Sequence, residues 1–230
     1  MKNKNLLTTA FKTAITDYYY LLNKNYPEKE TLKLVGDRFR LTGVQRTVLF
    51  RGITSKEKAL KRKTKLITLE NSKGKILYID GYNVLFTMMN YLLGKVIFIG
   101  NDGILRDSGG AYGKIENETT FYQSANLLLD FIPGNAFQEV TIYLDSPVSN
   151  SSSHLIQLEK HVQQKKIKGK IHLTRPVDLR LKQINDCDGV IATSDSQIID
   201  HTPGKIIDLA RSVLETTYGI AILDLGSLIE

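Results

Sequence analysis

Apolar residues in the first part of the chain recur at helical spacing. Between residues 6 and 22 they form one stripe, which predicts an amphipathic helix: Leu6, Leu7, Ala10, Phe11, Ala14, Ile15, Tyr18, Tyr19 and Leu22. The segment "NKNYP" (23–27) ends this helix, and a second helix is expected to begin near Glu28. The segments "ETLKLVGDRF" and "VQRTVLFRGI" predict two further short helices, and the turn "RLTG" between them offers Thr42 as a helix cap.

From Lys75 onward, short apolar runs alternate with helical segments. The runs predict strands: "KILYID", "KVIFIG", "VTIYLD", "KIHLT", "GVIAT" and "IAILDL". Helices are expected between most of them, at about 83–93, 119–131, 152–164 and 206–217. Continuous apolar strands are typical of parallel sheets that helices cover on both faces. The pattern therefore predicts an α/β fold over 71–230, with a doubly wound, mainly parallel sheet, preceded by a small basic all-helical domain over 1–70.

The distribution of charge supports this division. Residues 1–70 hold 16 Lys and Arg against 6 Asp and Glu, whereas residues 71–230 hold 15 against 18. A basic front and an acidic back suggest that one part attracts an anion while the other gathers carboxylates. Such an asymmetry points towards a nucleic acid as the partner.

Two basic features are candidates for contact with RNA. The helix–turn–helix outline would project Arg46 and Arg51 from its second helix, although an ordinary helical hairpin explains the same pattern equally well. The run "KEKALKRKTK" (56–65) is mainly lysine and arginine, with a single acid. It is either a solvated helix face or a patch that contacts phosphates through Lys61, Arg62, Lys63 and Lys65.

Composition limits the cellular setting and the kinds of site. One cysteine, Cys187, excludes an internal disulfide and suits a reducing compartment, and the four histidines are too scattered for zinc-ligand spacing. The first residues suggest an amphipathic helix rather than a signal peptide, and no apolar run approaches the roughly 20 residues that span a bilayer. We therefore expect a cytoplasmic protein without a membrane partner; the sequence leaves its oligomeric state open.

Aspartates stand at or just beyond several predicted strand ends. "KILYID" ends on Asp80, "VTIYLD" ends on Asp145, "VIATSD" reaches Asp195, and Asp178 follows "IHLTRPV". The same ends of parallel strands face one crevice, where clustered carboxylates repel one another unless protons or cations neutralise them. Oxygen-rich sites of this kind suit Mg²⁺ or Mn²⁺, and a pair of such ions about 4 Å apart can hydrolyse a phosphodiester.

Each polar residue at these strand ends also has a simpler interpretation. Asp and Asn are favoured helix caps and turn residues, so Asn83 can cap the helix that follows Asp80, and Asp145 can form a local turn. Taken together, the repeated carboxylates at one sheet edge favour a shared metal site. The segment "NDCDG" offers Asp186 or Asp188 as a replacement for Asp178, and this alternative stays open at the level of sequence.

Several of these segments resemble a known family. "IDGYNVL" is similar to the opening strand of the NYN group of PIN-like ribonucleases, and "TIYLDSPVS" resembles that group's third strand. "HLTRPVDLRLKQI" followed by "VIATSDSQII" resembles its closing pair. The similarity covers roughly 75–200 and rests on the order and spacing of short motifs. The whole chain also resembles an uncharacterised prokaryotic family with a helical front and a PIN-like back.

The resemblance implies a metal-dependent ribonuclease that acts on a structured RNA. It implies that Asp80, Asp145, Asp178 and Asp195 ligate Mg²⁺ or Mn²⁺, with Asn83, Thr193 and Ser194 orienting ligands or water. Residues 101–124 form a longer polar insert than the PIN-like pattern has; within it Glu118 matches the acid that such domains carry at a helix start, and Tyr112 can stack on a base.

Two rival functions follow from the same residues. One is a non-catalytic RNA-binding protein with a degenerate PIN-like core. The other is a phosphohydrolase of another α/β type, such as those that resemble haloacid dehalogenases; these need a second aspartate two residues after the first, where this chain has Tyr82. Glycine-loop nucleotide binding is disfavoured because no P-loop or G-x-G-x-x-G motif follows a strand.

Overall fold

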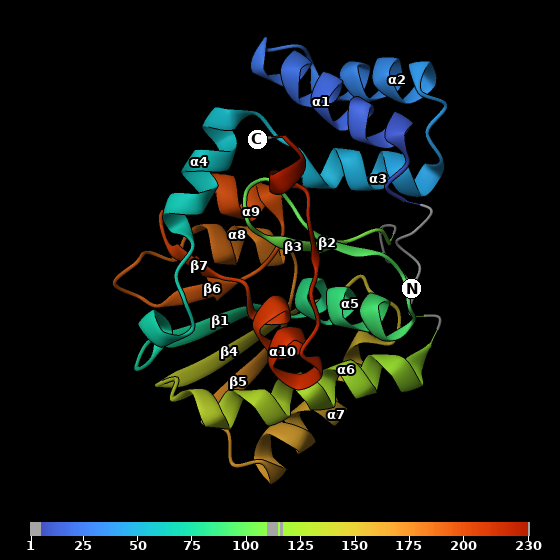
Figure 1. Ribbon diagram of the computed structural model, residues 1–230. Coiled ribbons are helices and arrows are strands. Elements are labelled where there is room, and N and C mark those ends of the chain that lie inside the picture. Colours follow the sequence, from blue (N-terminus) through green and yellow to red (C-terminus); the bar gives the residue numbers. More distant parts are fainter. Residues whose placement is uncertain (1–5, 110–114, 116, 230) are drawn as a thin grey trace.

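A computed structural model of the protein describes residues 6–109, 115 and 117–229. The described residues begin with the helical region, which contains α1 (Thr9–Asn23), α2 (Glu28–Arg38), α3 (Gly43–Gly52) and α4 (Lys56–Lys65). Figure 1 shows α1, α2 and α3 stacked at one end of the molecule, with α4 leading down towards the sheet. The expected basic helical region is confirmed, and the two helices expected from Glu28 and from "ETLKLVGDRF" are one helix, α2.

The first helix forms where its apolar stripe predicts. Phe11, Ala14, Ile15, Tyr18 and Leu22 are buried, and they recur every three or four residues along one face. The helix begins after Thr8, whose hydroxyl accepts a hydrogen bond from an amide of the first turn. The stripe therefore anchors α1 to the rest of the helical region.

The turn between α2 and α3 is built by local hydrogen bonds. Arg40 has a positive φ of 49°, which reverses the chain after α2. Thr42 caps α3 as expected: its hydroxyl accepts from the Gln45 amide at 3.2 Å, and its own amide donates to the Gln45 side chain at 3.0 Å. This reciprocal pair is a capping box, and it satisfies two backbone donors at the start of α3.

Five parallel strands form the main sheet, as predicted for an α/β fold. In chain order they are β1 (Ile76–Asp80), β4 (Glu139–Asp145), β5 (Gly169–Thr174), β6 (Val190–Ala192) and β7 (Lys205–Ile207). Their order across the sheet is β5-β4-β1-β6-β7. Counted along the chain this is 3-2-1-4-5, so the direction of winding reverses between β1 and β6.

Helices cover both faces of this sheet (Figure 1). The connecting helices are α5 (Gly81–Leu92), α6 (Glu118–Phe131), α7 (Ser151–Gln164), α8 (Val177–Lys182), α9 (Ser196–His201) and α10 (Leu209–Tyr218). Leu77 and Ile79 of β1 join the core formed with α5, α6, α7 and α10. Tyr78, between them in the strand, packs instead with the apolar residues of α8 and α9. This alternation gives a three-layer α/β/α arrangement.

Two expected strands lie outside the main sheet. "KVIFIG" contains β2 (Ile97–Ile99) and "IAILDL" contains β8 (Leu223–Asp224), and both pair in a second sheet of order β3-β2-β8. Its third strand, β3 (Leu105–Asp107), runs antiparallel to β2 and was not expected from the sequence. Nor was β7, which occupies the start of the helix expected at 206–217. The described residues also include the short 3₁₀ helices η2 (Glu70–Ser72), η3 (Ile132–Asn135) and η4 (Gly226–Leu228).

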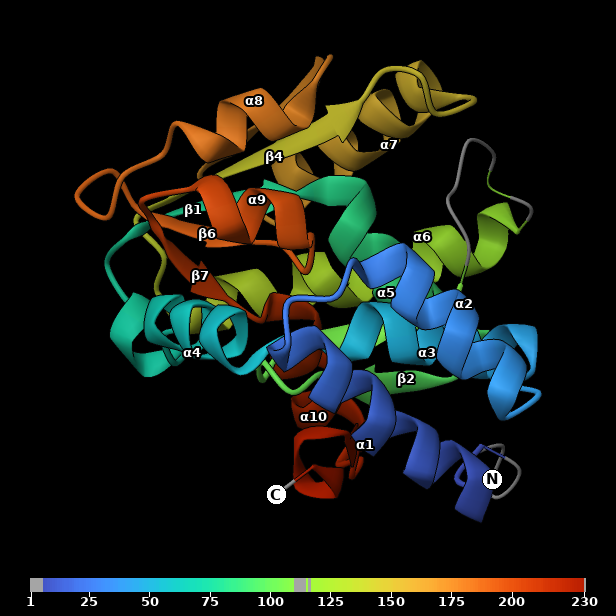
Figure 2. The same cartoon turned by 90° about the horizontal axis from the view of Figure 1, so that it is seen from above.

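The helical region and the second sheet share one apolar core. Phe98 of β2 and Leu225, just after β8, are fully buried among the apolar residues of α1 and α3. The approach is close at Gly52 of α3, where an added Cβ would lie 2.4 Å from Leu225 Cδ1 and 2.8 Å from Phe98 Cε2. Viewed from above in Figure 2, β2 is seen between α3 and α1. The helices are therefore packed onto the α/β part. Within the described residues, no helix has the length and apolarity needed to cross a bilayer.

Candidate functional site at the carboxyl edge of the main sheet

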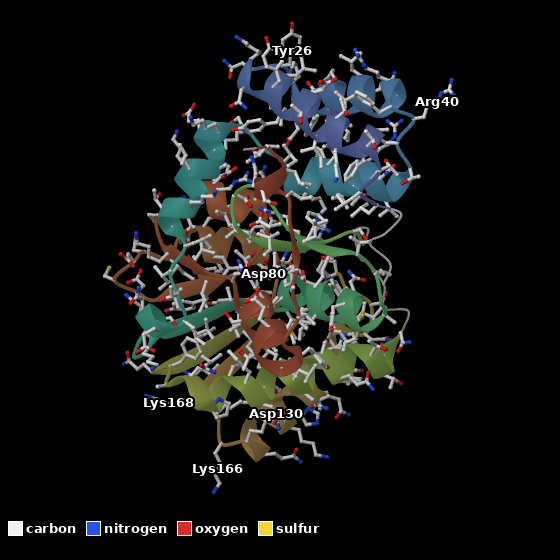
Figure 3. The ribbon with its side chains drawn as sticks, viewed as in Figure 1. Tyr26, Arg40, Asp80, Asp130, Lys166 and Lys168 are labelled. Carbon is white, nitrogen blue, oxygen red and sulfur yellow. The ribbon has the colours of Figure 1, made fainter. Side chains whose placement is uncertain are left out.

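Asp80 is the last residue of β1 and lies in the interior of the molecule, whereas Tyr26 and Arg40 lie at its periphery (Figure 3). Its side chain is only 7% exposed, and the Thr193 hydroxyl donates a hydrogen bond to its Oδ2 at 2.8 Å. Burial raises the pKa of Asp80 to about 8, and the negative charges of Asp195, Asp145 and Asp178 add to the rise. The aspartates expected at this edge therefore lie near enough to Asp80 to influence its ionisation.

The loop after β6 is tied to the start of α5. Asn83 Oδ1 accepts hydrogen bonds from the Ser194 amide at 2.8 Å and from the Ser194 hydroxyl at 3.0 Å. Asn83 thus uses its side-chain oxygen to hold this loop. The Thr193 hydroxyl accepts a bond from the Asp195 amide at 3.1 Å while donating to Asp80. Asp195 in turn caps α9 by accepting from the Gln197 amide at 2.6 Å.

Asp145, at the end of the neighbouring strand β4, and Asp178, at the start of α8, approach the same edge. Asp145 ends β4, and its Oδ1 accepts a long hydrogen bond of 3.4 Å from the Val177 amide. Burial raises the pKa of Asp145, and the charge of Asp178 raises it further, against the opposing effects of that amide and of Arg175. Asp178 lies in the first turn of α8 and is half exposed, with Lys182 Nζ at 3.8 Å.

Strand order explains why these groups gather. In a doubly wound sheet, ligands bind beyond the carboxyl ends of the strands, at the point where the winding reverses. Here that point lies between β1, which ends on Asp80, and β6, which leads into Thr193, Ser194 and Asp195. Among the described residues, no three His, Cys, Asp or Glu side chains are close enough together to enclose a metal ion. The edge is therefore an open group of carboxylates.

The alternatives to Asp178 lie at the opposite edge of the sheet. Asp186 faces Lys75, just before β1 begins, with 3.8 Å between its Oδ1 and the lysine Nζ. Asp188 belongs to the same turn and accepts hydrogen bonds from Asn185. The five residues of β1 separate this turn from Asp80 by roughly 16 Å at the usual rise of a strand. Of the three candidates, only Asp178 lies on the same edge as Asp80.

Glu118 belongs to a different group of side chains. It opens α6, and its carboxylate lies 3.1 Å from His154 Nε2. The other nitrogen of this buried ring, Nδ1, lies 2.9 Å from the Tyr82 hydroxyl. Burial raises the pKa of Tyr82, with added contributions from Glu118, Tyr122 and Asp145. Sequence reasoning missed this chain of hydrogen bonds, since nothing in the spacing of Tyr82, Glu118 and His154 indicates that they meet.

The polar insert contributes buried ion pairs. Asp102 accepts two hydrogen bonds from Arg106, at 2.7 and 2.8 Å, and one from Arg62 at 2.9 Å. Arg62 also donates to both oxygens of Asp200 at 2.7 Å. Burial alone would raise the pKa of Asp102, but Arg106 and Arg62 outweigh it and lower the pKa to about 2. Tyr112, the residue of the insert expected to stack on a base, lies outside the described residues.

Most of the basic residues considered for RNA contact are engaged within the chain. Arg62 is only 6% exposed, and Lys65 Nζ donates to backbone carbonyls at the end of α9, among them that of Thr202 at 2.7 Å. Arg46 donates to Leu41 and Asp37 beneath α2, and Arg51 donates to the Asp107 carbonyl at 2.8 Å. Lys61 and Lys63 are exposed, and Lys61 pairs with Glu57 on the same helix. The contribution of these six residues to RNA binding stays a prediction.

Comparison with known proteins places the chain in a family. No solved structure matches it. It is 30% identical over 207 residues to the uncharacterized protein MJ0935 of Methanocaldococcus jannaschii, a match that covers 90% of this chain and 97% of the relative. Residues 10–65 are similar to the protein of unknown function DUF434. Residues 69–212, which include the whole carboxyl edge of the main sheet, match the domain of unknown function DUF5616, and the chain belongs to that family.

Proposed function

We propose that the protein is a metal-dependent ribonuclease with a PIN-like α/β domain. The observation that carries the proposal is the position of four aspartates, Asp80, Asp145, Asp178 and Asp195, at the carboxyl edge where the sheet reverses its winding. A purely structural role would require these aspartates only as local helix caps. It leaves unexplained why Asp195, Asp145 and Asp178 lie close enough to raise the pKa of the buried Asp80.

The donor set suits a small divalent cation. All four side chains offer oxygen, and crowding of their charges favours a neutralising ion over water alone. Mg²⁺ commonly binds through one or two carboxylates and keeps several waters, leaving positions for substrate phosphate. An open group of carboxylates is consistent with that mode, because no enclosing set of three ligands is needed. When bound, such an ion would lower the pKa of a water and offset the phosphate charge.

The remaining residues would fix the carboxylates. Asp80 and Asp195 are the strongest candidates to hold the ion, because they flank the point of reversal. Thr193 would orient Asp80 by donating to one of its oxygens and would position Asp195 by accepting from its amide. Asn83 would keep the intervening loop in place through Ser194. None of these roles needs a histidine, since the attacking water would lose its proton to solvent or to a carboxylate.

The test is cleavage of total cellular RNA by the purified protein in Mn²⁺, followed by mapping of the new ends. We expect cleavage by the wild type and by Asp186→Asn, which changes an aspartate at the opposite edge of the sheet. Asp80→Asn and Asp195→Asn should each lose activity by about a hundredfold. Equal cleavage by the wild type and Asp195→Asn would identify a contaminating nuclease and refute the proposal. RNA binding without cleavage would favour the non-catalytic alternative.

A further inference from the structure

A cavity of about 280 Å³ lies between the helical region and the candidate site. Asn83, Ser194 and Asp195 line it on the side of the sheet. Phe50, at the end of α3, and Lys58, in α4, line it on the side of the helices. Its volume is close to the lower end of the roughly 300–1,000 Å³ typical of small-ligand sites. The helical region therefore helps to form a cavity that opens beside the carboxylates.

The charged groups deepest in this cavity neutralise one another. Asp102 is held by Arg106 and Arg62, and Arg62 also pairs with Asp200. In contrast, Lys58 is exposed and takes part in no ion pair among the described residues. Its charge helps to lower the pKa of Asp200, which Arg62 already pairs with, and Lys58 has no salt bridge of its own among the described residues, so its ammonium group can contact an anion in the cavity.

Phe50 gives the same wall an aromatic surface. Phe50 is 38% exposed, and among the described residues it packs against no other aromatic ring. Phe50 and Lys58 line the same cavity, and proteins that bind single-stranded nucleic acid combine these two kinds of side chain, because a ring stacks on a base and a cation contacts a phosphate. Asp195 lines the same cavity, so a nucleotide bound there would lie next to the carboxylates of the candidate site.

We propose that the cavity binds one unpaired nucleotide of the RNA, adjacent to the phosphodiester that the carboxylates address. The base stacks on Phe50, and a neighbouring phosphate contacts Lys58. The inference rests on the proposed function and adds to it that the nucleotide next to the cleaved bond is single-stranded. It also gives the helical region a direct part in substrate binding.

The path of the strand beyond this nucleotide follows from a second hollow. About 490 Å³ in volume, it lies between α4 and α9 and shares Lys58, Arg62, Gln197 and Asp200 with the first cavity. Lys61 and Lys65 also line it, on the face of α4 that is turned towards α9. A strand leaving the first cavity would pass these lysines, although Lys61 already pairs with Glu57 and Lys65 Nζ already donates to the Thr202 carbonyl.

Binding of a short single-stranded RNA tests the inference without cleavage. The probe carries a fluorescent label and is titrated with the full chain in EDTA, with anisotropy as the readout. We expect Phe50→Leu and Lys58→Ala each to weaken binding about tenfold, since stacking of one base or contact with one phosphate has this order of effect. Matched controls are Tyr20→Leu, an exposed ring of α1, and Lys33→Ala, an exposed lysine of α2; both should bind as the wild type does.

The outcomes separate this inference from the proposed function. Unchanged binding in both Phe50→Leu and Lys58→Ala would overturn the nucleotide site even if the protein cleaves RNA. Equal binding of the probe and of a fully paired duplex would also overturn it, since a paired base cannot stack on Phe50. Loss of binding in these two variants, with controls intact, supports the site even if no cleavage is found. Circular dichroism confirms that each variant is folded.

Discussion

At the scale of single residues, Asp80 lies in a position where its ionised form lowers the stability of the folded protein. Burial and three nearby carboxylates raise its pKa from 3.8 to about 8 in the folded protein. In the unfolded chain the group loses its proton near pH 4, so between pH 4 and 8 the folded state binds more protons. The free energy of unfolding should therefore fall as the pH rises through this window.

This effect can be measured by denaturant unfolding in EDTA from pH 5 to 8. We expect wild-type stability to decline over this range by up to a few kcal/mol, the order expected from a shift of several pKa units. Asp80→Asn removes the titrating group and should flatten the decline, whereas Asp186→Asn should leave it unchanged. A decline of equal size in Asp80→Asn would show that another group causes it.

A bound cation should offset the loss of stability that the charged form of Asp80 causes at high pH. An ion that binds only the folded state raises stability in proportion to the logarithm of its concentration. At pH 8 we expect Mn²⁺ to raise the melting temperature of the wild type by several degrees, about the shift that 1–2 kcal/mol produces in a domain of this size. The shift should vanish in Asp80→Asn and Asp195→Asn and persist in Asp186→Asn. A shift of the same size in all four proteins would place the ion elsewhere.

At the scale of elements, α4 packs against α9 and so connects the helical region to the α/β part. Its basic character first suggests a surface for RNA, yet Arg62 is buried in ion pairs with Asp102 and Asp200. Removing one partner from such a network leaves buried charges without compensation, which costs about 3–5 kcal/mol. We therefore expect Arg62→Met to lower the free energy of unfolding by about that amount, as measured in urea.

The neighbouring residue provides the control for this prediction. Lys63 is exposed on the same helix, so Lys63→Met should change stability by less than about 0.5 kcal/mol. If Arg62→Met were as stable as Lys63→Met, the ion pairs would contribute little. In that case the arginine would be available for another role.

The element pattern was largely predictable because it depends on local periodicity. The stripe of α1, the cap at Thr42 and the runs that became β1, β4, β5 and β6 all follow from spacing within a few residues. Local spacing does not show which strands belong to which of the two sheets, because β2 and β8 pair although more than 100 residues separate them in the chain. β3 has the sequence Leu-Arg-Asp, with two charged residues in three, and β7 ends two residues before α10 begins, so neither stands out as a separate apolar run.

The positions of the candidate site residues could be predicted as far as the ends of the strands could be predicted. Asp80, Asp145, Asp178 and Asp195 were located by their position after apolar runs, and parallel strands bring such positions to one edge. The hydrogen bonds that link Tyr82, His154 and Glu118 could not be predicted, since they depend on how α5, α6 and α7 pack. Nor does the sequence distinguish a buried arginine from an exposed one within a basic run, as Arg62 and Lys63 illustrate.

At the scale of the whole molecule, the helical region and the second sheet should unfold together. Leu225 is fully buried against residues of α1 and α3, although more than 170 residues separate it from α3. Leu225→Ala should therefore cost about 2–5 kcal/mol, the usual range for such a truncation in a core. Hydrogen exchange should show faster exchange of α1 amides as well as of the second sheet. Loss of protection confined to β8 would indicate that the two parts are independent.

The packing of Leu225 and Phe98 against α1 and α3 also sets the order of events on the ribosome. The four helices leave the exit tunnel first, but the apolar surface that completes their core arrives only after residue 225 has been made. During that interval of roughly ten seconds or more, at 5–20 residues per second, α1 and α3 can pack on each other, but the part of their apolar surface that Leu225 covers stays exposed. A chaperone that shields nascent chains would find a binding surface there.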